Sequence, residues 1–164
     1  MAPESPGYGC PGGIMGVNMA GFTIDYQEVF RVLPGAVALL TPDGVILDVN
    51  DGYLEAAGRE LADVLGRNVF EAFPSNPTDP GDSGQRMLRV SLETVVSTGE
   101  RDVMRTVRYD VEDPGRPGQF EERYWYVVNT PLRDADDRVA AIVHKADEIT
   151  HIVNQARNVL ADHG

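Results

Sequence analysis

Cysteine is nearly absent from this chain of 164 residues. The single example, Cys10, lies in a stretch rich in Gly and Pro near the start of the sequence. One cysteine cannot form an intramolecular disulfide framework or a cysteine-based metal site. A protein without disulfides suits a reducing compartment, so we expect this one to be cytoplasmic.

Long hydrophobic runs are missing as well. Crossing a bilayer takes about 20 consecutive apolar residues, and no stretch of the sequence approaches that length. Residues 1–21 also lack the basic segment followed by an apolar segment that marks a secretory signal. We expect no contact with a membrane, and the Pro and Gly content predicts a disordered leader over residues 1–22.

Positive charge is scarce. The chain has 14 Lys and Arg against 26 Asp and Glu, a net charge of -12, and no basic cluster of more than two residues. Proteins that bind phosphate backbones need a basic surface, so nucleic acid is not an expected partner. The remaining composition, 42% hydrophobic and 24% charged, is that of a globular protein, and the length corresponds to one domain.

The first regular elements are a helix and a hairpin. Apolar residues at i, i+3, i+4 and i+7 predict a helix over residues 25–33, with Tyr26 and Phe30 on its apolar face. Apolar runs at 36–40 and 45–49 flank Thr41-Pro42-Asp43-Gly44, a sequence suited to a tight turn. This pattern predicts a β-hairpin.

Helical segments occupy the middle of the chain, and strands dominate its last third. The expected helices are 51–57, 60–65, 69–73 and the longer 85–98, with a loop at 74–84, where turn-forming residues are dense. The expected strands are 102–111, 120–132 and 138–146, followed by a helix at 150–162.

Links between consecutive strands are short, so neighbouring strands should pair antiparallel. The helical middle must then cross from one edge of the sheet to the other over one face. The predicted fold is α+β: a five-stranded antiparallel sheet with helices packed on one face, an N-terminal flanking helix and a C-terminal helix. We place the domain with its flanking helix at residues 23–150 and the C-terminal linker helix at residues 151–164.

Several segments between residues 25 and 150 resemble the PAS sensor fold. The first are the hairpin 40–46 with Asp48-Val49-Asn50 and the segment 64–68, and the later ones are Trp125 with 129–132 and the closing Glu148-Ile149-Thr150, which is similar to the family's Asp-Ile-Thr cap. The strings 120–125 and 128–131 look most like PAS modules at the front of bacterial signalling proteins, including histidine kinases.

The resemblance implies which face of the last strands is inward, a point that alternation leaves open because both faces are apolar. In related PAS domains the positions matching Trp125, Val127 and Asn129 point into the helical cup, as do those matching Ile142, His144 and Ala146. The other face would be available to the first helix or to a second protomer. That expected outer and dimer face comprises Tyr26, Phe30, Tyr124, Tyr126, Val128 and Val143.

The same resemblance brings Trp125, Asn129 and His144 together at a cavity, where an imidazole and an amide would orient a small polar ligand. The other expected lining residues are Tyr53, Phe70, Tyr109, Val127 and Ile142. The alternative is a filled core in which these polar groups bond to each other or to buried water. The sequence leaves both interpretations open.

Known PAS cofactors can be compared with these residues. Flavin-adduct photosensors need a cysteine near residues 66–69, and thioester-linked chromophores need one too, so the absence of cysteine after Cys10 excludes both. Haem-binding members carry a histidine on the helix matching 85–98, which has none, and His144 has no apparent second ligand. We therefore do not expect haem or another metal, and the cofactor, if there is one, stays unknown.

No catalytic group is evident. His151 lacks the neighbouring Glu and Arg of a phosphoacceptor histidine, and no Gly-rich nucleotide loop precedes a strand-helix unit. One alternative is a small α+β-cup enzyme in which His144 acts with Glu122 or Asp110. Alternation disfavours it, because it places both carboxylates on the face opposite Trp125.

The sequence thus predicts a sensory and dimerisation module of a cytoplasmic bacterial signalling protein, as in two-component systems. We expect it to form a homodimer, to sense a small ligand or a partner, and to relay the signal through its last helix. The receiver would be an effector such as a histidine kinase, in the same chain or another. A ligand-free protein interaction module is the main alternative.

Overall fold

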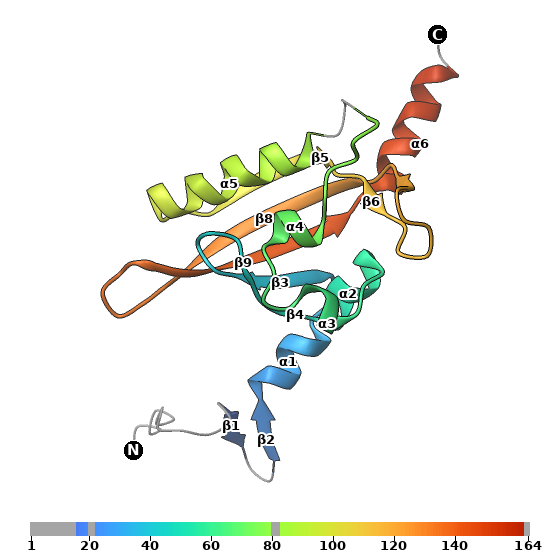
Figure 1. Ribbon diagram of the computed structural model, residues 1–164. Coiled ribbons are helices and arrows are strands. Elements are labelled where there is room, and N and C mark those ends of the chain that lie inside the picture. Colours follow the sequence, from blue (N-terminus) through green and yellow to red (C-terminus); the bar gives the residue numbers. More distant parts are fainter. Residues whose placement is uncertain (1–15, 20–21, 80–82, 163–164) are drawn as a thin grey trace.

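The computed structural model describes residues 16–19, 22–79 and 83–162, and its centre is a five-stranded sheet (Figure 1). The strands lie in the order β4-β3-β9-β8-β5, and every neighbouring pair is antiparallel. Their bounds are β3 (Ala36–Leu40), β4 (Ile46–Val49), β5 (Asp102–Arg108), β8 (Tyr124–Arg133) and β9 (Val139–Glu148). The predicted α+β fold with a five-stranded antiparallel sheet is confirmed.

Helices from the middle of the chain cover one face of this sheet (Figure 1). These helices are α2 (Asp51–Ala57), α3 (Leu61–Val64), α4 (Val69–Ala72) and α5 (Gly84–Thr98). Two further helices flank the domain, α1 (Tyr26–Val32) and α6 (Thr150–Ala161). The longest central helix, α5, packs on β5 and β8 through Leu88, Leu92 and Val95, which recur at the spacing of one helix face and are buried. The core therefore lies between α5, the short helices and the sheet.

Asn50 ties the start of α2 to the neighbouring strand. Its side chain accepts hydrogen bonds from the backbone N–H groups of Val37 and Tyr53, both at 2.9 Å. It also donates to the carbonyl groups of Leu33 and Gly35 at 2.8 and 2.9 Å. One fully buried residue thus caps α2 and fixes the chain that enters β3.

The predicted leader differs from the structure in its last part. Residues 16–19 form β1 (Gly16–Met19), which pairs antiparallel with β2 (Phe22–Asp25). The prediction considered only Gly and Pro, whereas Phe22, Thr23 and Ile24 are residues that favour strands. Residues 1–15, on which most of that prediction falls, lie outside the described residues.

Two predicted strands are shorter than expected. The strand predicted at 102–111 ends at Arg108, and the one predicted at 120–132 begins at Tyr124. The residues between them include a separate two-stranded ribbon, β6 (Val111–Glu112) with β7 (Phe120–Glu121). Asp110 interrupts the first strand because its carboxylate turns to accept hydrogen bonds from Arg108 and Asn76.

The two flanking helices extend beyond the layered domain in Figure 1. Neither α1 nor α6 has a buried residue. Helix α1 contacts β2 and α2, with an ion pair of 2.7 Å between Arg31 and Asp51. Its apolar face, expected to meet either the sheet or a second protomer, is largely open, and Tyr26 is 48% exposed.

Tyr124 does not have the open outer position that was predicted. It is only 9% exposed, because Arg157 of α6 covers it. The other three strand residues assigned to the outer face, Tyr126, Val128 and Val143, are half-buried. The C-terminal helix, rather than the N-terminal one, therefore occupies one end of this face.

Within the described ranges, no helix is both long enough and apolar enough to span a bilayer.

Candidate functional site

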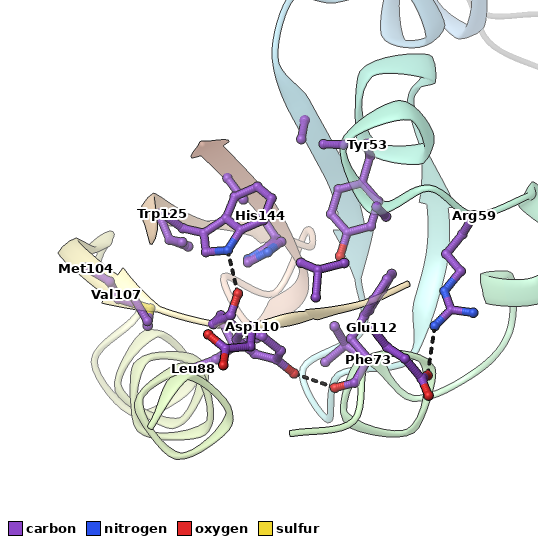
Figure 2. A pocket seen from close by; sticks show the side chains of 18 of the residues that line it. Tyr53, Arg59, Phe73, Leu88, Met104, Val107, Asp110, Glu112, Trp125 and His144 are labelled. Atoms are coloured by element: carbon purple, nitrogen blue, oxygen red, sulfur yellow. Dashed lines mark hydrogen bonds and ion pairs between the residues drawn. The ribbon is translucent and has the colours of Figure 1, made fainter. Parts of the chain in front are cut away.

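A cavity of about 80 Å³ lies between the sheet and its helices (Figure 2). Strands β3, β5, β8 and β9 form one wall, and α2, the start of α5 and the segment after α4 form the other. Its volume exceeds the roughly 10–15 Å³ that one water molecule requires. Most of its lining is aromatic or aliphatic, including Phe73, Leu88, Val107, Trp125 and Val127.

Trp125 is fixed in the wall by hydrogen bonds to backbone. Its indole nitrogen donates to the carbonyl oxygen of Tyr109 at 2.9 Å, and the hydroxyl of Tyr109 donates to the carbonyl oxygen of Phe73 at 2.5 Å. Both polar groups are thereby satisfied inside the protein. The two rings can then present apolar surface to whatever fills the cavity.

Tyr53 reaches the cavity from α2, and Figure 2 shows it facing the same space as His144. Its ring lies 6.2 Å from the His144 ring and 5.8 Å from the Phe73 ring, in edge-to-face arrangements. Burial raises the pKa of Tyr53 well above its usual value, so the hydroxyl stays protonated. None of the described residues forms a hydrogen bond with this hydroxyl, which is therefore available to a ligand or water.

His144 reaches the cavity from β9. Its Nδ1 lies 2.7 Å from Oδ1 of Asn129, and Nε2 has no hydrogen-bond partner among the residues the structure describes. Burial lowers the pKa of His144 to about 4 because the charged imidazolium would lose its hydration. The ring is neutral at physiological pH and offers one nitrogen to the cavity.

Five of the eight predicted ligand-binding residues line this cavity. They are Tyr53, Tyr109, Trp125, Val127 and His144. Whether they bind a ligand stays a prediction.

The other three predicted residues lie elsewhere. Asn129 is on the inward face but behind His144, where α5 covers it, and Ile142 is fully buried in the core. Phe70 packs beneath the guanidinium of Arg89 at 4.1 Å, while its neighbour Val69 takes the cavity position. One step along a helix turns the side chain by about 100°, and the short helix predicted at 69–73 has too few turns to show which of two neighbouring residues faces the cavity.

Charged residues at the cavity were missed by sequence reasoning. Arg59, just after α2, lines it together with Glu112 of β6, and the two form an ion pair of 3.3 Å. Nε of Arg59 is buried without a hydrogen-bond partner in the described part of the chain. Both residues follow or precede turns, where neither alternation nor helical spacing indicates which way a side chain points.

The predicted orientation of the carboxylates is wrong for Asp110. Alternation placed it on the far face from Trp125, but it is buried and lines the same cavity as His144. Strand geometry ends at Arg108, so the period of two no longer applies at Asp110. Glu122, the other carboxylate considered, is bound to Arg157 at 2.8 Å.

The carboxylate of Asp110 is engaged rather than free. It accepts hydrogen bonds from Nε and Nη2 of Arg108 and from Nδ2 of Asn76, each at 2.9 Å. Burial alone would raise the pKa of Asp110, but these bonds together outweigh it and lower the pKa. A carboxylate held in this way is a weak base, so its proximity to the cavity adds little to the enzyme alternative.

No cluster of three potential metal-binding side chains occurs within residues 16–19, 22–79 and 83–162.

The antiparallel sheet order, the covering helices and the cavity between them define the class of the protein, an α+β cup with an internal pocket. A family model described as the PAS fold matches residues 30–153. The chain therefore belongs to the PAS family of sensory modules. No curated protein matches it.

Solved structures support the same fold at low sequence identity. A PAS domain from Colwellia psychrerythraea superposes with a TM-score of 0.60 at 15% identity, covering 77% of this chain and 95% of that one. A sensory box sensor histidine kinase from Vibrio cholerae gives 0.51 at 18% identity, covering 76% and 89%. An RNA-binding light-oxygen-voltage receptor gives 0.60 at 17% identity, and the match covers 84% of this chain but only 37% of that receptor.

Proposed function

We propose that this chain is the sensory input module of a cytoplasmic bacterial signalling protein, which binds a small molecule in the cavity. The cavity of about 80 Å³ carries this proposal. Most of its lining is apolar, yet the Tyr53 hydroxyl and Nε2 of His144 both face it without a partner among the described residues. An apolar space with a few convergent polar groups is the usual form of a small-molecule site.

The proposed output is α6, which follows directly after the strand that carries His144. The backbone N–H of Ile149 donates to the carbonyl of Tyr124 at 2.8 Å, and the N–H of Tyr124 donates to the Thr150 hydroxyl at 3.0 Å. These two hydrogen bonds hold the first turn of α6 against Tyr124, the neighbour of Trp125 on β8. A ligand that shifts β8 or β9 would move α6, and an effector such as a histidine kinase would respond.

We also propose that the module forms a homodimer through α1 and the open part of the outer sheet face. Helix α1 exposes Tyr26, Val29 and Val32, and the sheet presents Tyr126, Val128 and Val143. A second copy would offer the same apolar surface, as a two-fold interface requires. Exposed apolar surface on α6, where Leu160 is 75% exposed, would extend such a pairing.

The second candidate function is a dimerisation module that binds no small molecule. The open apolar surfaces of α1 and α6 favour it, because they do not depend on the cavity. The two functions differ in one measurable property. Only the sensor gains stability from a molecule that enters the cavity.

Trp125 provides the test, because it is the only tryptophan in the chain and it lines the cavity. Native mass spectrometry of the protein purified from a bacterial host should show a retained small molecule that is absent under denaturing conditions. Removing that molecule should change the Trp125 emission and lower the melting temperature. A mass equal to the bare chain, with a melting temperature that no small molecule raises, would favour the ligand-free module.

A matched pair of variants controls for global damage. Val127→Phe fills the cavity and should abolish retention of the molecule, whereas Val128→Phe, one residue further along β8, points to the other face and should retain it. Equal retention by both variants would place the bound molecule outside the cavity.

A further inference from the structure

Four side chains form a continuous series of hydrogen bonds from the edge strand to the cavity. The Ser91 hydroxyl donates to the Asp102 carboxylate at 2.5 Å, and Nδ2 of Asn129 donates to the Ser91 oxygen at 2.8 Å. Oδ1 of Asn129 then lies 2.7 Å from Nδ1 of His144. Ser91, Asn129 and His144 are all buried, and each comes from a different element of the fold.

The carboxylate of Asp102, at one end of the series, determines which groups donate and which accept along all of it. An ionised carboxylate can only accept a hydrogen bond, so the Ser91 hydroxyl donates its one proton to Asp102. The Ser91 oxygen is then left to accept from the Asn129 NH₂ group. The contact of that NH₂ group with the sulfur of Met104, at 3.9 Å, agrees with this orientation of the amide.

The orientation of Asn129 fixes the tautomer of His144. The amide oxygen that faces Nδ1 has no hydrogen to give, so Nδ1 of His144 must carry the ring proton. In a neutral ring, Nε2 then carries a lone pair and can only accept a hydrogen bond. Burial, which lowers the pKa of His144 to about 4, keeps the ring neutral. The cavity therefore contains a hydrogen-bond acceptor set in an apolar wall.

We propose that the ligand of this cavity is a small, uncharged and mainly apolar molecule whose hydroxyl or N–H group donates a hydrogen bond to Nε2 of His144. Phenols, indoles and alcohols belong to this class. Carboxylates, ethers and ketones cannot make this bond, because they would place a lone pair against the lone pair of Nε2. This inference rests on the proposed sensory function and specifies the chemistry that it would detect.

The tautomer can be measured without any ligand. Long-range ¹H–¹⁵N correlation spectra of the uniformly labelled protein should show Nδ1 of His144 as the protonated nitrogen and Nε2 as the bare one. The chain has three histidines, and His144→Phe assigns the signal. A proton on Nε2 in the ligand-free protein would overturn the inference.

Asp102 should act as a positioning residue in the same spectra. In Asp102→Asn the amide can donate back to Ser91, which removes the fixed direction and should populate both tautomers of His144. Glu100→Gln, two residues away, removes a nearby exposed carboxylate outside the series and should leave the His144 signals unchanged. An unaltered tautomer in Asp102→Asn would show that Asp102 does not set the direction.

Paired probes test the ligand class by calorimetry or Trp125 fluorescence. Phenol should bind at least tenfold more tightly than fluorobenzene, and indole more tightly than indene, because only the first member of each pair donates a hydrogen bond. His144→Phe should remove that preference. Equal or tighter binding of fluorobenzene and indene would overturn the ligand class alone. If none of the four bound while the tautomer was as expected, the proposed sensing of small molecules would fail with it.

Discussion

Arg157 and Tyr124 join the last helix to the sheet through two contacts at once. Nη2 of Arg157 donates to the Tyr124 hydroxyl at 2.5 Å, and the guanidinium carbon lies 4.9 Å from the centre of the ring. Arg157 also binds Glu122 at 2.8 Å. Because Trp125 follows Tyr124 on β8, this contact links α6 to the strand that forms a wall of the cavity.

Arg157→Ala should loosen α6 without unfolding the domain. The helix has no buried residue, so it depends on a few contacts of this kind. We expect faster amide hydrogen exchange across residues 150–161 and little change in β8 or β9. Arg31→Ala, which removes an exposed ion pair on α1, should leave exchange in α6 unchanged. Equal exchange of α6 in the wild type and Arg157→Ala would contradict a structural role for this contact.

Asn50→Ala should be strongly destabilising. The substitution leaves buried N–H and carbonyl groups of the chain entering β3 without their partners, and each such group costs about 1–3 kcal/mol. We expect the free energy of unfolding, measured in urea, to fall by about 3 kcal/mol or more. Asn68→Ala, which removes a more exposed helix cap, should cost about 1 kcal/mol. A loss at Asn50 no larger than that at Asn68 would refute this assignment.

Stability should fall in mild acid because of His144. Its pKa drops from 6.5 to about 4 on folding, so between these values the unfolded state binds more protons than the folded state. Above pH 6.5 the titration of His144 leaves the free energy of unfolding unchanged. The free energy of unfolding falls as the pH drops from 6.5 to about 4, and below about pH 4 His144 causes no further loss. This loss amounts to about 3 kcal/mol at most.

The difference between variants isolates this effect from the carboxylates that also titrate in acid. His144→Phe should unfold with a flatter dependence on pH between 6.5 and 4, while the exposed His151→Phe should follow the wild type. Identical pH profiles for the wild type and His144→Phe would mean that His144 titrates normally in the folded protein.

The sheet and the helix order could be predicted because periodic patterns report burial. Buried residues recur along β9 and α5 at the spacing of their elements, β3 is a continuous apolar run, and turn residues mark the ends. The inward side of β8 could not be derived in this way, since Trp125 and Tyr124 are both buried, one by the core and the other by α6. Only the resemblance to PAS domains distinguished the two faces.

The cavity was partly predictable for the same reason. Trp125, Val127 and His144 lie on regular strands, where alternation holds once the face is known. Arg59 and Asp110 lie where regular structure has ended, and their orientation depends on long-range partners, Glu112 for one and Asn76 for the other. No local pattern in the sequence specifies such contacts.

Tyr126→Glu tests the proposed homodimer. The substitution places a charge on the half-buried apolar part of the outer face, and desolvating that charge in an interface would be costly. If a second copy covers this face, the dimer dissociation constant measured by sedimentation should rise at least tenfold. Val90→Glu adds the same charge at a position that is 57% exposed on α5, which covers the opposite face of the sheet, and should leave sedimentation unchanged. A Tyr126→Glu protein that sediments like the wild type would exclude this face as the dimer contact and leave α1 and α6 as the surfaces to test.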